Sequence, residues 1–453
     1  MFTGKQGIGL VTKKVWYLLL LNLVSLLTIH AQTTGDYRSA VTGNWGTLGT
    51  WQRWDGGAWA VPTTGQGYPG QNSSPNLVTI QSNHAITQNV SPAFAIVSLG
   101  FSANLLSASL TINSGNTLNV SGAVAFTDPT LNAQNQTIAV NGAANFGSVT
   151  MANTTNNTRL NTITVATTGT LGISGNITTN GAVDENFLTL NGNATFNMAG
   201  TFTGGTFALS PTSTVNWNGD NANSIRSATY GNLIVSIPAS AAASRTKSLA
   251  GNVTVQAVFT VQSLHTIQTV TLNTAQFNFT VTGSSQINDR GQFADNNNTG
   301  TNIFTGAVSV ASNGIMSSAN TSAVSFGGNI TNNGSISLSA NTTALNGASM
   351  TLSGSGNYTF QNLTLSTTGS NNVSYTGSGL LTVNGALTFS TNGLLIISST
   401  NNAYFGSNAT FYGHNSSRYI RIDDTNISNG QLIKYTGNNT NDWRRLYPIG
   451  TAT

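Results

Sequence analysis

The sequence predicts an all-β protein, a right-handed parallel β-helix (solenoid) with an N-terminal Trp-rich cap module. Short stretches in which every second residue is apolar recur along most of the chain, as expected for strands with one face inward. One nine-residue phrase returns at intervals too short for an independent domain. Hydrophobic residues make up 38% of the 453 residues and charged residues only 6%. A globular domain is typically about 25% charged, so we expect an apolar core beneath an uncharged polar surface.

The repeated phrase reads apolar, any, apolar, polar, Gly, any, apolar, any, apolar. Clear copies span Leu118–Phe126, Ile138–Phe146, Leu188–Phe196 and Leu381–Phe389. Most gaps between the glycines of successive copies lie between 17 and 23 residues. A unit of about 20 residues must bury its apolar face against its neighbours. We therefore expect one elongated solenoid of roughly 15 coils over residues 98–412, about 70 Å long at about 4.8 Å per coil.

Each half of the phrase is predicted to be a strand. Extra short strands between the phrases, such as Thr162–Val165, indicate about three strands per coil. The alternation points Val120, Val140, Leu190 and Val383 inward, at equivalent positions of their coils. Asn-Gly between alternating runs is also a strong hairpin signal, so a stack of hairpins is the rival architecture.

Four regions follow from composition. Residues 1–31 are predicted to be a signal peptide, because Lys5, Lys13 and Lys14 precede an apolar run from Val15 to Ile29. That run is shorter than the roughly 20 residues of a membrane anchor. Residues 32–97 form the Trp/Gly-rich cap module, residues 98–412 the β-solenoid repeat array, and residues 413–453 the start of a C-terminal module, truncated. We expect a secreted or outer cell-surface protein with no membrane span after signal cleavage.

Charge and cysteine content narrow the function classes. The chain has 15 Lys+Arg and 11 Asp+Glu, and three of the lysines lie in the leader. A nearly neutral mature chain has no electrostatic footprint for nucleic acid. With no cysteine, disulfide scaffolds and Cys-ligated metal sites are excluded.

The sequence offers little acid–base chemistry, which requires positioned carboxylates or histidines. Glu185 is the single Glu, and the histidines after the leader are His84, His265 and His414. Asp184-Glu185 and Asp423-Asp424 are adjacent pairs, whose side chains point to opposite faces of a strand. We therefore assign no catalytic, cofactor-binding or metal-ligating residue, expect no cofactor and no enzyme activity, and leave the ligand-binding residues unknown.

Trp45, Trp51, Trp54 and Trp59 have two interpretations. They could form a platform on which sugars stack, or belong to the cap that seals the first coil, which terminal repeats require. We favour the cap. A polysaccharide-lyase-like β-helix would need an Asp cluster for Ca²⁺. Between residues 101 and 220 the acids are only Asp128, Asp184, Glu185 and Asp220, too few for that cluster.

Both ends of the chain resemble a known group of proteins. The residues concerned are Tyr37-Arg-Ser39, Gly43-Asn-Trp45, Gly49-Thr-Trp51, Ser417-Arg-Tyr419 and Leu446-Tyr-Pro-Ile-Gly450. They resemble segments of secreted Bacteroidota β-helix, adhesin-like surface proteins of the type IX secretion group. Such proteins usually end in a sorting domain. The chain stops at Thr453 without one, so we expect a fragment of a longer protein.

The function predicted from the sequence is therefore structural. We expect a non-catalytic, secreted or cell-surface, adhesin-like repeat protein that acts as a stiff stalk or display scaffold, with extracellular glycans or other surface proteins as partners. The alternative is a glycan-binding or polysaccharide-lyase-like β-helix protein. A third hypothesis, ice binding through flat threonine arrays, has the weakness that threonines such as Thr162 and Thr164 show no fixed register in the sequence.

Overall fold

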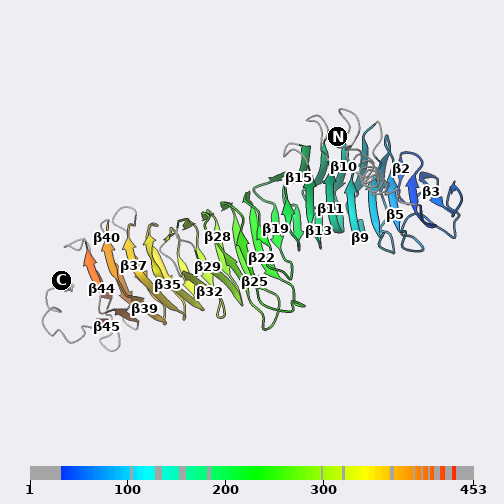
Figure 1. Cartoon of the computed structure of the whole chain (residues 1–453). Helices are drawn as coiled ribbons and strands as arrows, with labels where there is room; N and C mark the ends of the chain where they lie inside the picture. The colour runs from blue at the N-terminus through cyan, green and yellow to red at the C-terminus, as the bar shows by residue number, and fades with distance from the viewer. Residues whose placement is uncertain are drawn as a thin grey trace, which may run out of the picture.

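The protein is an elongated stack of β-strands, described here from a computed structural model (Figure 1). The structure describes residues 32–102, 106–127, 135–152, 160–180, 185–296, 299–318, 322–367, 372–390, 393–398, 401–406, 409–412, 419–423 and 431–434. The predicted signal peptide, His414, Asp128, Asp184, Asp424 and most of the predicted C-terminal module lie outside these residues. Within them the secondary structure is strand, except for one 3₁₀ turn, η1 (Leu48–Thr50).

Parallel pairing between successive coils confirms the all-β solenoid, with about 12 turns. Sheet A contains a long ladder that runs through both halves of the molecule. Its strands are β9 (Thr117–Phe126), β11 (Ala143–Ala152), β13 (Thr170–Ile173), β16 (Thr195–Met198), β19 (Thr214–Trp217), β22 (Asn232–Ile237), β25 (Val258–Ser263), β28 (Ser284–Ile287), β31 (Val308–Val310), β34 (Ile330–Asn332), β36 (Met350–Ser353), β38 (Val373–Tyr375), β41 (Leu395–Ser398) and β44 (Ile420–Asp423). The right hand of the coils remains a prediction from the strong preference of parallel crossovers.

The N-terminal coils, residues 77–217, complete each turn with two further ladders. The short ladder of sheet A consists of β5 (Leu77–Ile80), β7 (Ser98–Phe101), the second halves of β9 and β11, β14 (Ile177–Asn180) and β17 (Phe202–Thr203). Sheet B consists of β2 (Gly43–Asn44), β6 (Ala85–Gln88), β8 (Ala108–Ile112), β10 (Gln136–Val140), β12 (Asn161–Val165), β15 (Asn186–Leu190) and β18 (Thr206–Leu209).

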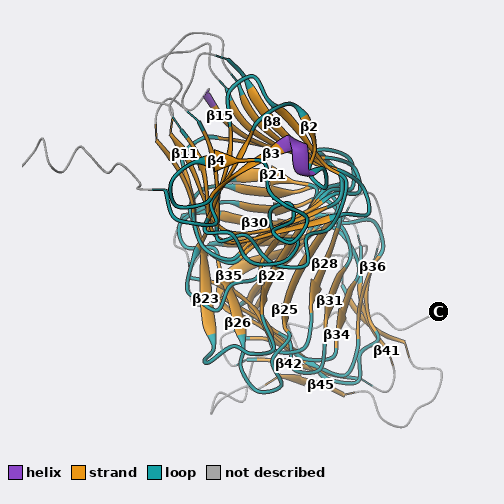
Figure 2. Cartoon of the chain, turned by 90° about the vertical axis from the view of Figure 1, so that its right-hand side faces the viewer, coloured by secondary structure: helices purple, strands orange, loops and turns teal. Residues whose placement is uncertain are grey.

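The C-terminal coils, residues 224–434, replace these two ladders by the two ladders of sheet C. The first contains β20 (Ser224–Ile225), β23 (Arg245–Leu249), β26 (Val270–Asn273), β29 (Gly291–Asp295), β32 (Ile315–Ser318), the first halves of β35 (Ser335–Leu345) and β37 (Asn357–Leu365), β39 (Leu380–Val383), β42 (Asn402–Phe405) and β45 (Gln431–Lys434). The second contains β21 (Ala228–Tyr230), β24 (Val253–Val255), β27 (Phe279–Val281), β30 (Thr301–Phe304), β33 (Ala323–Phe326), the second halves of β35 and β37, β40 (Ala386–Phe389) and β43 (Thr410–Tyr412). Seen from the N-terminal end, β23 and β26 lie opposite β28 and β31 across the interior (Figure 2).

The repeated phrase marks a corner of the coil and not a hairpin. In Leu118–Phe126 both halves belong to the bent strand β9, and both pair in parallel with β11. In Ile138–Phe146 the halves belong to β10 in sheet B and β11 in sheet A. The hairpin rival is therefore wrong. Because the phrase occurs at different corners in different coils, its spacing does not measure the coil.

The coils are mostly longer than the predicted 20 residues. Paired residues are offset by 28 positions between Val149 and Ile177 and by 25 between Ile163 and Leu188. The shortest part of the long ladder lies in the middle, where Val215 and Leu233 are offset by only 18. The longer offset explains why about 12 turns are present instead of roughly 15.

The interior is one continuous apolar core, formed by every second residue of the strands. Val120, Val140, Leu190 and Val383 are all buried, as predicted. Their predicted equivalence is only half right. Val140 and Leu190 occupy one register of sheet B, two coils apart with Val165 between them. Val120 lies in sheet A and Val383 in sheet C, because their phrases mark other corners.

Strands also cover the edge of the first coil. β1 (Tyr37–Ser39) pairs in parallel with β5 and antiparallel with β3 (Trp51–Trp54), and β3 pairs with β4 (Trp59–Ala60). Regular coil pairing begins at β5, inside the segment assigned to the cap. At the other end, β44 and β45 continue sheets A and C beyond residue 412.

Candidate functional site

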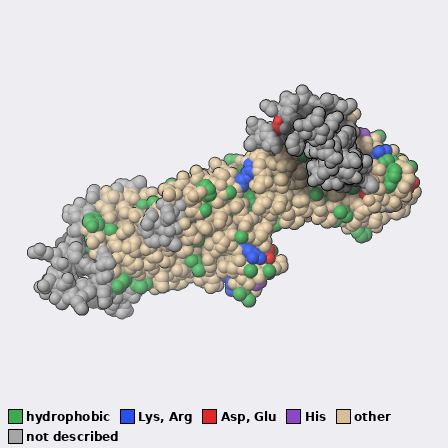
Figure 3. All heavy atoms as spheres, viewed as in Figure 1, with side chains coloured by type: hydrophobic (Ala, Val, Ile, Leu, Met, Phe, Trp, Pro, Cys, Tyr) green, Lys and Arg blue, Asp and Glu red, His purple; other side chains and the backbone are tan. Residues whose placement is uncertain are grey.

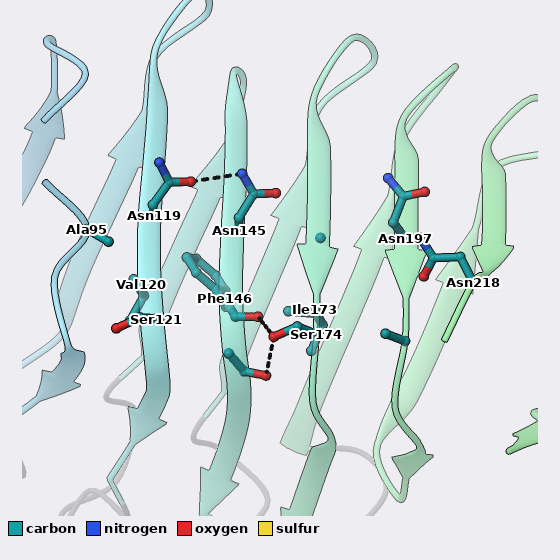
Figure 4. Close-up of a pocket in the computed structure, with 13 residues that line it drawn as sticks. Ala95, Asn119, Val120, Ser121, Asn145, Phe146, Ile173, Ser174, Asn197 and Asn218 are labelled. Atoms are coloured by element: carbon teal, nitrogen blue, oxygen red, sulfur yellow. Dashed lines mark hydrogen bonds between the residues drawn. The ribbon is translucent and has the colours of Figure 1, made fainter. Parts of the chain in front are cut away.

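A hollow of about 570 Å³ follows the outer corner at which the long and short ladders of sheet A meet. Strands β9, β11, β13 and β16 cross it side by side, and Ala95 borders it beside β9 (Figure 4). Its polar side chains are Asn119, Ser121, Asn145, Ser174, Asn197 and Asn218. We call it the asparagine groove.

One row of outward residues crosses the long ladder at a single register. Asn119 pairs with Asn145, Asn145 with Gly172, Gly172 with Asn197, and Asn197 with Asn216. The Asn145 Nδ2 donates to Asn119 Oδ1 at 2.9 Å. The Asn216 Nδ2 donates to Asn197 Oδ1 at 3.3 Å. The row is thus two asparagine pairs separated by a glycine.

Gly172 interrupts the row for want of a side chain. A Cβ atom built at this position would lie 2.8 Å from the Asn145 Oδ1. That oxygen is the end of a flexible side chain, so a rotation of Asn145 would relieve the contact. The backbone of Gly172 therefore tolerates a side chain.

Glycines at the neighbouring corner let successive coils approach closely. A Cβ atom at Gly175 would lie 2.6 Å from the Gly147 carbonyl oxygen, and one at Gly200 would lie 2.0 Å from the Gly175 carbonyl oxygen. Here the obstacle is backbone, which cannot move aside. Gly147, Gly175 and Gly200 are required for the corner, whereas Gly172 is not.

None of the thirteen residues that line the groove is titratable. Amides and hydroxyls both donate and accept hydrogen bonds without carrying charge. The groove therefore presents neutral polar chemistry to a ligand.

Charged residues instead gather at another corner, where sheet A turns into sheet C. The Arg245 Nε donates to Asp220 Oδ1 at 2.8 Å, and the Ala242 N–H donates to Asp220 Oδ2 at 2.9 Å. The Arg245 bond is the main cause that lowers the pKa of Asp220. Asp289 and Arg290 form an ion pair in a later turn. Figure 3 shows that the face in view is otherwise mostly uncharged.

Lys247, on β23, is completely buried beneath this corner. Its Nζ donates to the Gly219 carbonyl at 2.9 Å, the Asn221 carbonyl at 3.2 Å and Asn223 Oδ1 at 2.7 Å. Burial lowers the pKa of Lys247 to about 8. Three oxygens satisfy the three N–H donors of the ammonium group, so the residue has a sufficient structural role.

The described histidines lie apart. His84 follows β5, and its Nδ1 lies 2.8 Å from Ser39 Oγ; burial lowers its pKa. His265 lies between β25 and β26, where Nδ1 accepts the N–H groups of Ile267 and Gln268 at 2.9 and 3.0 Å. His84 is thus in the first described coil and His265 beyond the middle of the stack. Glu185 is buried at the start of β15.

The tryptophans divide into two pairs. Trp45 and Trp51 are fully buried, with ring centroids 4.8 Å apart. Their indole N–H groups donate to the carbonyls of Pro69 and Trp45 at 3.0 and 2.8 Å. Trp54 and Trp59 are half-buried, with centroids 5.4 Å apart. Burial removes Trp45 and Trp51 from the hypothetical sugar platform.

Threonines do share a register on the outer face of sheet B, which corrects the expectation from the sequence. Thr87, Thr111, Thr164 and Thr189 are in line, with Ala139 between the second and third. The neighbouring row is mixed, because Phe187 follows Thr162. The register was hidden because the coils differ in length.

Comparison with protein-family models, with curated proteins and with solved structures found no match for this chain. Among the described residues, His, Cys, Asp and Glu form no group of three or more that could hold a metal ion. No helix within the described residues has the length and apolarity to cross a membrane.

Sequence reasoning missed the asparagine groove, although a signal for it exists. Five segments share the pattern apolar, Asn or Gly, apolar, small or Asn, then a small residue. They begin at Leu118, Ala144, Leu171, Phe196 and Val215. Aligning them would have predicted the outward row, provided that unequal coil lengths were allowed.

Proposed function

We propose that this protein is a stiff extracellular stalk or display scaffold that holds other modules away from a surface. The observation that carries the proposal is the unbroken long ladder of sheet A, from β9 to β44, over one continuous core. Each coil bonds to the coils before and after it. Bending such a stack would break ladder hydrogen bonds and open the core, so the shape resists deformation.

Two further features support a spacer. Few charges lie on the surface between the ends of the stack, which suits an inert rod exposed to varied ionic conditions. The basic and apolar leader at residues 1–31 supports export. Adhesin-like display on a bacterial surface is the setting that agrees with both.

The proposal predicts that length matters and that the identity of a coil does not. Residues 285–307 form one coil, because Ser285 pairs directly with Val308. Deleting them should leave a folded rod shorter by about 4.8 Å, measured as the maximum dimension in small-angle scattering. Antibodies against the Asp289–Arg290 turn should label intact cells that express the full chain.

Two results would contradict the proposal. One is labelling only after the cells are broken open. The other is reproducible cleavage of a polysaccharide by the purified chain, lost in Asp220→Ala or Asp289→Ala. We expect a panel of common polysaccharides to remain uncut by the wild-type chain and by both variants.

A further inference from the structure

We propose that the asparagine groove binds a neutral, hydroxyl-rich polysaccharide chain that lies along the axis of the solenoid. This ligand site is additional to the role as a stalk. It rests on the hydrogen-bond pattern of the groove, its lack of charge and its direction across successive coils.

The interrupted row leaves one acceptor and one donor facing each other. Since Asn145 donates through Nδ2 to Asn119, its Oδ1 points toward Gly172. Since Asn197 accepts at Oδ1 from Asn216, its Nδ2 points back toward Gly172 (Figure 4). A hydroxyl donates and accepts at the same atom. A sugar hydroxyl placed over Gly172 would therefore satisfy both amides.

The chemistry of the lining selects against other ligands. An acidic chain would give up hydration without gaining a cationic partner, because no lining residue is charged. Val120, Phe146 and Ile173 contribute to the wall, but their side chains are buried in the core, so apolar side chains of a peptide would find no pocket. Peptides that add a strand need a free sheet edge, whereas the groove lies on the face of strands that are already paired.

The direction of the groove suits an extended chain. Successive coils are about 4.8 Å apart, close to the length of one sugar residue in an extended β-linked chain. A ligand that crosses β9, β11, β13 and β16 would thus meet an equivalent row position at each residue. Because no aromatic ring is exposed in the lining, affinity should come from several hydrogen bonds and grow with chain length.

The test uses calorimetric titration of the full mature chain with cellohexaose, xylohexaose and mannohexaose, their trisaccharides, hexagalacturonate, and an uncharged Ser/Asn decapeptide. We expect at least one neutral hexasaccharide to bind, and its trisaccharide to bind at least about tenfold more weakly. Hexagalacturonate and the peptide should show no binding. Failure of all three neutral hexasaccharides, or binding of only the acidic chain or the peptide, would overturn the proposal.

Gly172→Asn is the decisive variant, because it fills the interruption with an amide that completes the row. It should weaken hexasaccharide binding by about tenfold or more while the melting temperature stays equal or rises. Gly100→Asn is the matched control, since Gly100 faces outward on β7 outside the groove and its added Cβ would meet only Leu77 at 3.9 Å. Asn145→Ala and Asn197→Ala should each weaken binding severalfold. Unchanged affinity in a folded Gly172→Asn, Asn145→Ala or Asn197→Ala protein would overturn the assignment.

Discussion

The N-terminal and C-terminal coils fill their interiors in different ways. In the N-terminal coils a row of amides lies at one inner corner. Gln136, Asn161 and Asn186 share a register and are buried. Gln136 and Asn161 donate to the carbonyls of Thr127 and Ala152 at 2.9 and 3.1 Å. These bonds satisfy the backbone where the chain leaves one strand and enters the next.

In the C-terminal coils the corresponding space holds stacked aromatic rings. The centroids of Phe279 and Phe293 lie 5.6 Å apart, those of Phe293 and Phe304 5.3 Å, and those of Phe304 and Phe326 5.5 Å. All four residues are buried. These coils therefore rely on ring packing where the N-terminal coils rely on hydrogen bonds.

The comparison shows that a solenoid can change its interior chemistry without losing its ladder. The change coincides with the shortest coils, at β16, β19 and β22, and with the buried Lys247. Sheet B ends at β18 and sheet C begins at β20, while the long ladder continues through both. Each half can then use the filling that suits its own corner lengths.

The largest effect that we predict separates the two halves. Leu190→Asp places an unpaired charge in the core of the N-terminal coils and should lower the free energy of unfolding by about 3–5 kcal/mol. Because repeat stacks are coupled only through neighbours, hydrogen exchange should accelerate in the N-terminal coils and much less beyond β25. Thr189→Asp, at an outward position of the same strand, is the control. Equal losses in both variants would mean that the register is shifted by one residue.

A second substitution pair compares the two fillings directly. Phe293→Ala and Phe126→Ala both empty a buried ring site and should each cost about 3–5 kcal/mol. Phe293 has three ring neighbours, Phe259, Phe279 and Phe304, and Phe126 has one, Phe101. Ring pairs add about 0.5–1.5 kcal/mol beyond area, so Phe293→Ala should cost about 1 kcal/mol more in urea unfolding. A larger cost for Phe126→Ala would refute the ring-packing explanation.

The smallest effect concerns the junction and depends on pH. The pKa of Lys247 falls from its ordinary 10.5 to about 8 in the folded chain, so between these values the unfolded chain binds more protons. The free energy of unfolding should therefore rise with pH in this window, by on the order of 2 kcal/mol between pH 7 and 9.5. Urea unfolding of wild type and Lys247→Met measures the difference. The rise should be absent from the variant, and an identical rise in both would assign it to other groups.

The sequence by itself determined the strand alternation, the inward residues and the solenoid class. Val120, Val140, Leu190 and Val383 could be placed in the core because the two faces of a strand alternate with a period that any local stretch reveals. The absence of cysteine and the low charge likewise restricted the chemistry without any structure.

Only the tertiary structure decided which residues stack on one another. Neighbours along the axis are separated by 18 residues at Val215 and by 28 at Val149, because each turn between strands has its own length. The alternation restarts after every turn, so it carries no information about that offset. The row from Asn119 to Asn216, the threonine row of sheet B and the oxygen cage of Lys247 all depend on it. They became visible only when the coils were aligned by their hydrogen bonds.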